Sequence, residues 1–320
     1  MANTYNGLIN IYKEPGFTSN DVVAKMRGIL KQKKIGHTGT LDPDAVGVLV
    51  VCLGTGTKLV EMLTDHDKEY IAVVRLGVTT DTQDMSGQIL DECEVNVTKE
   101  ELREAARAFV GDYDQIPPMF SAIKQNGKKL YELAREGIEV ERKPRKIHID
   151  AITILDDSLL ESDHIFTMEV KCSKGTYIRT LCHDIGARLG CGAAMQHLTR
   201  TRVGAFSLDT AITLSQLEEL RDSGNLESVI KSPEYIFRDL DAIHVKDSAK
   251  KLLINGNSFR IDNVLNEDPE GVNDTQFAKE MFKDGNSFRV YSEDDVFFGI
   301  YTYNARTKQF GVDKFFYENN

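Results

Sequence analysis

The sequence KKIGHTGTLDPDAVGVLVVCLG, residues 33–54, joins a glycine-containing loop to a strongly apolar run. The run is rich in valine and too short to span a membrane, so it predicts a buried strand. The loop before it carries one acid, Asp42, and a Leu-Asp-Pro context taken alone is typical of an ordinary turn. Gly36 and Gly39 permit close approach of the backbone, and the strand would hold the loop on a rigid core. These features favour a carboxylate that the loop presents to a ligand.

The segments around this loop predict a chain that mixes helices and strands. GLINIYKEPG reads as a strand stopped by a Pro-Gly turn, and TSNDVVAKMRGILKQ as a capped amphipathic helix. Further strands are predicted at 70–77 and 164–172, and further helices at 99–110, at 176–190, where Gly190 ends the helix, and at 216–230. From about residue 244 short strand-like runs alternate with polar turns, which predicts a small β-rich second domain.

Composition limits the class of protein. The chain has 320 residues, 41% of them hydrophobic, which is enough for two domains with real cores. Its five cysteines form no CxxC pair, and the opening MANTYNGLINIYKEPG has no basic segment followed by an apolar one. We therefore expect a reduced, cytoplasmic protein without a membrane anchor.

The net charge of −11 is unevenly distributed. Residues 211–320 hold 13 basic and 20 acidic residues, a net −7, so most of the negative charge lies there. Two stretches are locally basic: 22–34 has five bases and no acid, and 124–146 has eight bases and four acids. Such stretches can bind phosphates on an acidic protein because the local field governs contact, although solvated helix faces have the same composition.

Motifs for a nucleotide cofactor or a metal ion are missing from the sequence. GTGTK at 54–58 lacks the spacing of a phosphate-binding P-loop, and no GxGxxG opens a strand-to-helix turn. The seven histidines are scattered and have no zinc-like spacing to cysteines. We therefore expect no nucleotide cofactor, no metal and no other cofactor.

Several motifs in a fixed order resemble the pseudouridine synthases of the TruB type, which modify tRNA. GHTGTLDPDAVGVLVVCLGTGTK resembles the aspartate-bearing motif of that family, and KEYIAVVRLGVTTDTQDMSG its tyrosine motif. CSKGTYIRTLCHDIG and LTRTRVGAF resemble its arginine and leucine motifs. GLINIYKEPGFTSNDVV looks like the N-terminal lysine motif, and QIPPMFSAIKQNGKKLYELAREGIEVERKPR like the RNA-gripping insertion. The resemblance covers roughly residues 7–210.

The resemblance implies an α+β fold with a central mixed, largely antiparallel sheet crossed by an active-site cleft. The catalytic domain is expected at 1–240, with the RNA-gripping insertion at about 120–147. A small PUA-like β-barrel, an RNA-binding domain, is expected at 241–320. The implied reaction is isomerisation of the T-loop uridine of tRNA, position 55, after the base is flipped out of the RNA. A monomer that binds the T-arm is expected, without a membrane or cofactor.

Individual site residues follow from the same resemblance. Asp42 is expected to be the nucleophile or base, Arg179 the arginine that pairs with it, and Tyr70 the tyrosine that stacks on uracil and assists proton removal. His37, Tyr177 and Leu198 are expected to contact the substrate with Tyr70. Lys13 is expected to be structural. The RNA-binding side chains are expected in the basic insertion: Lys124, Lys128, Lys129, Arg142, Lys143, Arg145 and Lys146.

Alternatives remain at this point. A carboxylate could add to C6 of uracil, add to C1′ of ribose, or remove a sugar proton and start a glycal route. The chain could act on another RNA, as the guide-RNA-dependent relatives do, or serve as an RNA-binding or tRNA-folding module.

Overall fold

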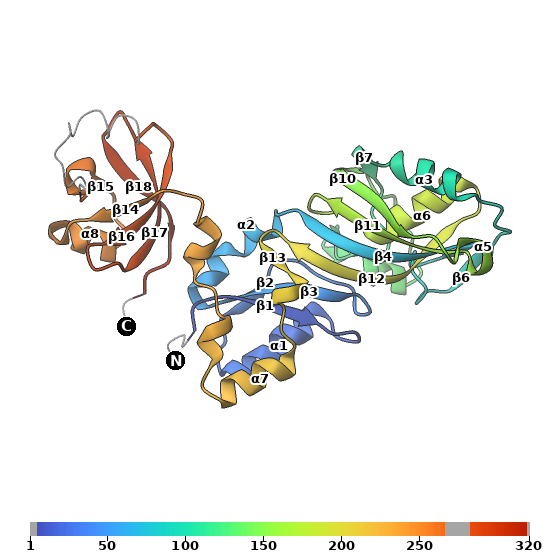
Figure 1. Ribbon diagram of the computed structural model, residues 1–320, viewed down its shortest axis with the longest axis horizontal. Helices are drawn as coiled ribbons and strands as arrows, with labels where there is room; N and C mark the ends of the chain where they lie inside the picture. The colour runs from blue at the N-terminus through green and yellow to red at the C-terminus, as the bar shows by residue number, and fades with distance from the viewer. Residues whose placement is uncertain (1–4, 266–281, 319–320) are drawn as a thin grey trace.

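The computed structural model describes residues 5–265 and 282–318 and contains two separate larger sheets (Figure 1). The first runs in the order β1-β3-β12-β4-β11-β10-β7, with β2 paired to β3 and β13 to β12. Its strands are β1 (Gly7–Lys13), β2 (Ile35–His37), β3 (Val46–Leu53), β4 (Lys68–Leu76), β7 (Gly111–Gln115), β10 (Arg145–Asp156), β11 (Ile165–Cys172), β12 (Ala193–Val203) and β13 (Phe206–Ser207). Two short hairpins lie outside it: β5 (Val78–Thr80) with β6 (Ile89–Glu92), and β8 (Lys124–Gln125) with β9 (Lys128–Lys129).

Neighbouring strands of this sheet are antiparallel except where β3 meets β12. The parallel contact is short, because only Thr199–Val46 and Arg200–Gly47 are in register. By contrast, β12 pairs with β4 along its whole length, from Ala193–Leu76 to Val203–Lys68. The expected mixed, largely antiparallel sheet is therefore confirmed.

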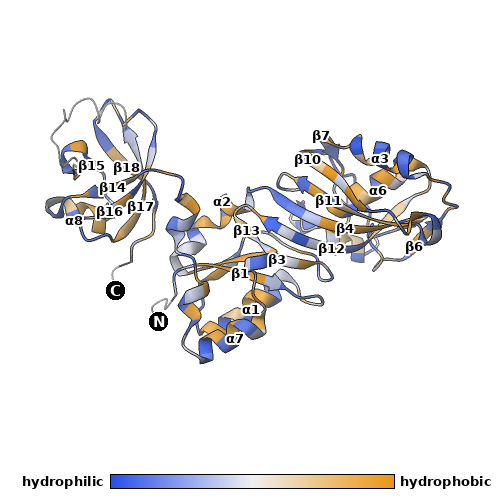
Figure 2. Ribbon diagram, in the orientation of Figure 1, coloured by the Kyte–Doolittle hydropathy of each residue, from blue (hydrophilic) through white to orange (hydrophobic). Residues whose placement is uncertain are grey.

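Helices cover the two ends of the sheet separately (Figure 1). One core packs α3 and α6 against β4, β10, β11 and β12, and another packs α1 and α7 against β1 and β3. Apolar and polar residues alternate along α1 and α7 (Figure 2), as expected for helices with one buried face. The helices are α1 (Ser19–Leu30), α2 (Val60–Thr64), α3 (Lys99–Arg107), α4 (Leu130–Arg135), α5 (Leu160–Asp163), α6 (Ile178–Leu189), α7 (Leu214–Asp222) and α8 (Lys250–Ile254). Within the described ranges, no helix is long and apolar enough to cross a bilayer.

Strand β3 is apolar throughout because both of its faces are covered. Leu49, Val51 and Leu53 pack toward α1 and α7. The alternate residues Val48, Val50 and Cys52 join a second cluster that includes Ile300 and Phe316. A strand buried on both sides reads as a continuous apolar run, which explains the segment that follows the Asp42 loop.

The C-terminal part is a curled five-stranded sheet in the order β14-β16-β17-β18-β15. Strands β14 and β15 at its two edges do not pair with each other, so the expected barrel is a half-barrel, and a single bridge between Val245 and Val264 links β14 to the segment after β15. Of the expected 241–320, residues 266–281 and 319–320 lie outside the described residues. Its strands are β14 (Ala242–Val245), β15 (Phe259–Arg260), β16 (Ser287–Ser292), β17 (Phe297–Asn304) and β18 (Gln309–Phe315).

Two local predictions differ from the structure. The helix predicted at 216–230 corresponds to α7, which is shorter and ends at Asp222. Gly224, with φ +74°, follows it, and a short 3₁₀ turn covers 226–229. A left-handed glycine ends a helix readily, because it lacks a Cβ that would clash there. Gly36, expected in the loop before Asp42, lies instead in β2, because Ile35–His37 pairs with β3.

Candidate active site

The Asp42 loop is fixed by hydrogen bonds to buried groups. Leu41 N donates to Ser19 Oγ at 2.9 Å, and Ala45 N donates to the Asp42 carbonyl oxygen at 3.2 Å. Lys13, which is fully buried, donates from Nζ to the Pro43 carbonyl at 2.8 Å. The loop therefore enters and leaves Asp42 along a defined path.

Arg179 and Asp42 form a two-point ion pair. Nε of Arg179 lies 3.0 Å from Oδ2, and Nη2 donates to Oδ1 at 3.1 Å. The Arg179 side chain is 6% exposed, whereas 39% of the Asp42 side chain remains open to solvent. The planar guanidinium thus fixes the orientation of a carboxylate that an outside molecule can still reach.

The remaining donors of Arg179 are also engaged. Nη1 donates to the Thr82 carbonyl at 3.0 Å and lies 3.5 Å from Oδ2 of Asp84, while Nη2 donates to the Phe120 carbonyl at 3.0 Å. Asp84 itself accepts from Thr82 Oγ1 at 2.7 Å and from Ser86 N at 3.0 Å. Sequence reasoning missed Asp84, although it lies within the tyrosine motif.

The environment of Asp42 moves its pKa in opposite directions. Burial raises the pKa of this carboxyl above its ordinary value of 3.8, the Arg179 charge opposes that change, and Asp84 adds to it. The net direction is upward. A carboxylate with a raised pKa is a better base than an exposed one, and it is ionised at neutral pH while the pKa stays well below 7.

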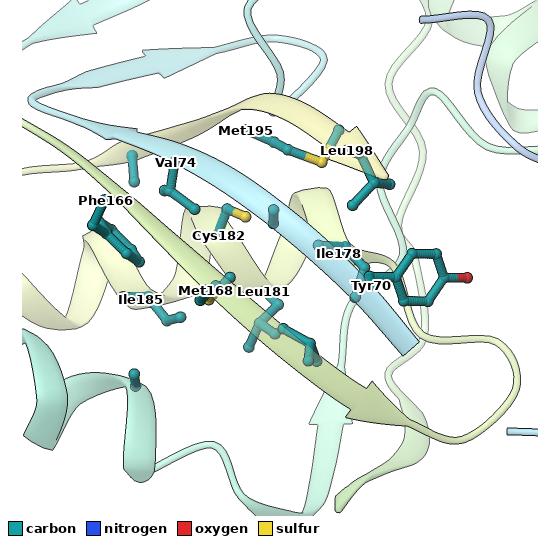
Figure 3. Close-up of a cluster of buried hydrophobic side chains, with 14 of the residues drawn as sticks. Tyr70, Val74, Phe166, Met168, Ile178, Leu181, Cys182, Ile185, Met195 and Leu198 are labelled. Atoms are coloured by element: carbon teal, nitrogen blue, oxygen red, sulfur yellow. The ribbon is translucent and has the colours of Figure 1, made fainter. Parts of the chain in front are cut away.

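Tyr70 and Leu198 lie together at one end of the apolar cluster, and the phenol oxygen of Tyr70 points out of it (Figure 3). Each side chain is 7% exposed. Burial raises the pKa of the Tyr70 phenol, while the charge of Arg200 and a hydrogen bond with it lower it. Leu41, next to Asp42 in the chain, belongs to the same cluster, so the loop and Tyr70 share one core.

Tyr177 precedes α6 directly and is half-buried. Its main chain is held twice by Gln115, which donates to the Tyr177 carbonyl at 3.0 Å and accepts from the Tyr177 amide at 2.8 Å. Burial raises the pKa of its phenol, and the nearby Ser121 hydroxyl and the charges of Arg145 and Arg179 oppose that change. Tyr177 and Arg179 are thus presented by the same helix start.

His37 lies at the end of β2 and is half-buried. Its Nδ1 accepts a hydrogen bond of 3.3 Å from Gly39 N, so Nδ1 carries no proton in this arrangement. Burial and the charge of Arg200 lower the pKa of the imidazole below its ordinary value. The imidazole of His37, at the start of the Asp42 loop, is therefore neutral.

The expected RNA-binding side chains lie on β8, β9, the segment after α4, and the start of β10. Lys128 pairs with Glu136 at 3.1 Å and Arg142 with Glu139 at 3.4 Å, and Lys146 lies 3.9 Å from Asp112. Lys129 lies near the Tyr131 hydroxyl at 3.2 Å. Lys124, Lys143 and Arg145 are exposed and make no ion pair with the described residues.

Comparison with known proteins first defines the class. Residues 27–178 match the family model described as the N-terminal domain of TruB family pseudouridylate synthases. Residues 179–238 match the one described as the C-terminal domain of tRNA pseudouridylate synthase B. The fold and the family matches are therefore those of a pseudouridylate synthase, an isomerase. The chain belongs to the TruB family.

Similar relatives share most of their length with this chain. The tRNA pseudouridine synthase B of Lachnoclostridium phytofermentans is 48% identical over 315 residues, which is 97% of this chain and 99% of that protein. The protein of the same name from Clostridium perfringens strain 13 is 45% identical over 92% of this chain and 94% of its own. A solved Cbf5-Nop10-Gar1 complex contains a chain that is 26% identical, with a TM-score of 0.68, over 97% of this chain and 85% of that one.

Proposed function

We propose that this protein converts uridine to pseudouridine in the T-loop of tRNA, at position 55, with Asp42 as the catalytic carboxylate. The observation that carries the proposal is the two-point Asp42–Arg179 pair in a member of this family. Relatives named tRNA pseudouridine synthase B, at 44–48% identity, support tRNA as the substrate.

The reaction needs no redox step and no energy source. The N1–C1′ bond breaks, the uracil turns, and C5 bonds to C1′ while the C5 proton is lost and N1 gains one. Asp42 would add to C6 or C1′, or remove a sugar proton, and each of these roles needs its ionised form. Arg179 would keep the carboxylate ionised and oriented.

The surrounding side chains would hold the flipped base. Tyr70 offers an aromatic face with a phenol at its edge, and Leu198 beside it offers an apolar contact. Tyr177 and the neutral His37 would complete the contacts with the nucleoside. Because proton removal from C5 needs an acceptor, we assign the phenol of Tyr70 to assist it.

The basic insertion would hold the RNA around the flipped base. RNA loops are recognised through phosphates and splayed bases, and the exposed cations of this segment suit that contact. We assign this role to Lys124, Lys128, Lys129, Arg142, Lys143, Arg145 and Lys146. The domain arrangement we propose is a catalytic unit at 1–240 followed by an RNA-binding unit at 241–320, in a cytoplasmic monomer.

The test is incubation of the protein with unmodified tRNA, followed by mapping of pseudouridine with carbodiimide and reverse transcription. Isomerisation leaves the RNA mass unchanged, and the adduct stops the copying enzyme one residue from the modified base. A stop one residue before position 55, which reports pseudouridine at 55, is expected. Absence of any new stop, with tRNA still bound, would favour an RNA-binding or tRNA-folding module instead. A stop only in another RNA would favour the other uridine isomerase.

A further inference from the structure

We propose that Arg200 is a positioning residue for this reaction, holding the backbone before Asp42 and the phenol of Tyr70 in a fixed relation. The inference rests on the proposed function. It begins with the place of Arg200 in the sheet, because β12 lies between β3, which carries the Asp42 loop, and β4, which carries Tyr70.

Arg200 and its neighbour Thr199 are the two residues of β12 that are in register with both β3 and β4. Arg200 is opposite Tyr70 in the antiparallel register with β4 and opposite Gly47 in the short parallel register with β3. Gly47 has φ +106°, and a Cβ there would come 2.2 Å from the Arg200 carbonyl oxygen. Only glycine allows this approach, so β3 and its loop reach Arg200 at this point.

The guanidinium of Arg200 donates across the seam between β12 and β3. Nε donates to the Val48 carbonyl at 2.7 Å, Nη2 to the Gly39 carbonyl at 3.1 Å, and Nη1 to the Thr40 carbonyl at 3.5 Å. Gly39 and Thr40 come directly before Leu41 and Asp42 in the chain. One side chain thus fixes two successive peptide groups at the entry to Asp42.

The same guanidinium faces the titratable groups of the site. Around Tyr70 these are Arg200 on β12, Cys172 on β11 and Asp42 on its loop. His37 on β2 also lies within reach of the Arg200 charge. Removal of that charge would therefore raise the pKa of the Tyr70 phenol and of the His37 imidazole together.

Burial of Arg200 is not explained by packing alone. The residue is 1% exposed, and among the described residues no carboxylate lies within 4 Å of its nitrogens. An apolar side chain of similar volume commonly stabilises a core at least as well as a buried charge. The cation is offset here by the carbonyl oxygens of Gly39 and Thr40 in the Asp42 loop and of Val48 on β3, and its charge acts on the phenol of the neighbouring Tyr70.

The test compares Arg200→Met and Arg200→Lys with the parent protein in steady-state isomerisation of prefolded tRNA, which gives kcat and KM. Misplacement of a reacting group by about 1 Å can lower the rate about 10²-fold, and we expect a kcat loss of that order for Arg200→Met. We expect KM to change less than about threefold, and Arg200→Lys to recover part of the rate. Arg75→Met, an exposed arginine on β4, is the matched control and should keep the parent's rate.

Two further readouts separate positioning from a general loss of structure. In a Tyr70→Phe background the Arg200→Lys change should cost less than in the parent, because the two residues act together. The ¹³Cζ signal of Tyr70 is assigned by its loss in Tyr70→Phe. In Arg200→Met this signal should titrate at a higher pH than in the parent. If the methionine variant does not fold, Arg200→Lys should show the same change to a smaller extent.

The proposal is overturned if Arg200→Lys and Arg200→Met keep kcat within about threefold of the parent. It is also overturned if the loss is the same with and without the Tyr70 hydroxyl and the Tyr70 titration does not move. The titration needs no turnover, so it tests the Arg200–Tyr70 relation even if the parent forms no pseudouridine. Failure of the parent protein to form pseudouridine would by itself refute the proposed function but not the Arg200–Tyr70 relation.

Discussion

Asp84 and Asp42 share one arginine, since Nη1 of Arg179 lies 3.5 Å from Oδ2 of Asp84 and Nε lies 3.0 Å from Oδ2 of Asp42. The two carboxylates differ in access, because 16% of the Asp84 side chain and 39% of the Asp42 side chain are exposed. Only Asp42 is therefore open to a substrate, and Asp84 acts on it through Arg179 and through its own charge.

The Asp42→Asn change should abolish turnover and leave tRNA binding nearly intact. The amide has the same shape but lacks the ionised oxygen that the reaction needs. Single-turnover mapping at position 55 measures the rate, and filter binding measures affinity. Asp44→Asn, two residues away and exposed, is the control and should retain activity. A rate of a tenth of the parent's or more in Asp42→Asn would refute the assignment.

Arg179→Lys should lose most of the activity although it keeps the charge. Lysine cannot place two donors on one carboxylate and still bond to the carbonyls of Thr82 and Phe120. We expect a kcat loss on the order of 10²-fold with a smaller change in KM. Parental activity in this variant would show that Arg179 does not orient Asp42.

The acid limb of the pH–rate profile should report Asp42. Its pKa is raised, so on lowering the pH the carboxylate takes up a proton earlier than an ordinary aspartate would, and kcat/KM should begin to fall at a correspondingly higher pH. Asp84 contributes to the increase in pKa, so Asp84→Asn should move the limb to lower pH. Single-turnover rates on prefolded tRNA between pH 4 and 8 measure both profiles. Movement of the limb to higher pH would contradict this electrostatic role.

Lys13 should make stability depend on pH. Burial lowers its pKa to about 8, against 10.5 in the unfolded chain, so the unfolded state binds more protons between these values. The folded state therefore gains relative stability as pH rises through this window. Urea unfolding at pH 7 and pH 9.5 should show the parent gaining up to about 2 kcal/mol relative to Lys13→Met. A difference between the two proteins that does not change with pH would contradict the lowered pKa.

Local charge should govern RNA binding more than total charge does. Replacing Lys128, Lys129, Lys143 and Arg145 with glutamine should lower the slope of log affinity against log salt by up to about 0.9 per lost phosphate contact. The control neutralises four exposed acids on or just after α7, namely Glu218, Glu219, Asp222 and Glu227. Both variants are measured on an Asp42→Asn background. Equal shifts in the two would show that the insertion has no special role.

The sequence predicted the strands and helices well where one physical signal dominated. The apolar run that became β3 and the glycine that ends α6 at residue 190 are examples, since burial on two faces and a left-handed cap leave local marks. Asp42, Tyr70 and Arg179 were identified from motifs, not from local chemistry. Asp84 and Arg200 were missed, because their partners lie about 95 to 160 residues away in the chain and only the folded sheet reveals them.

The position of β12 has a consequence for how the protein is made. Without this strand the sheet falls into two unconnected parts, β1–β3 with the Asp42 loop and β4 with β11, β10 and β7. Arg200 is synthesised 158 residues after Asp42, a delay of about 8 to 30 s at translation rates of roughly 5–20 residues per second. Until β12 is made, the edges of β3 and β4 that pair with it in the finished sheet lack this partner. Strand β12 thus closes both edges and brings the Asp42 loop beside Tyr70 in one event.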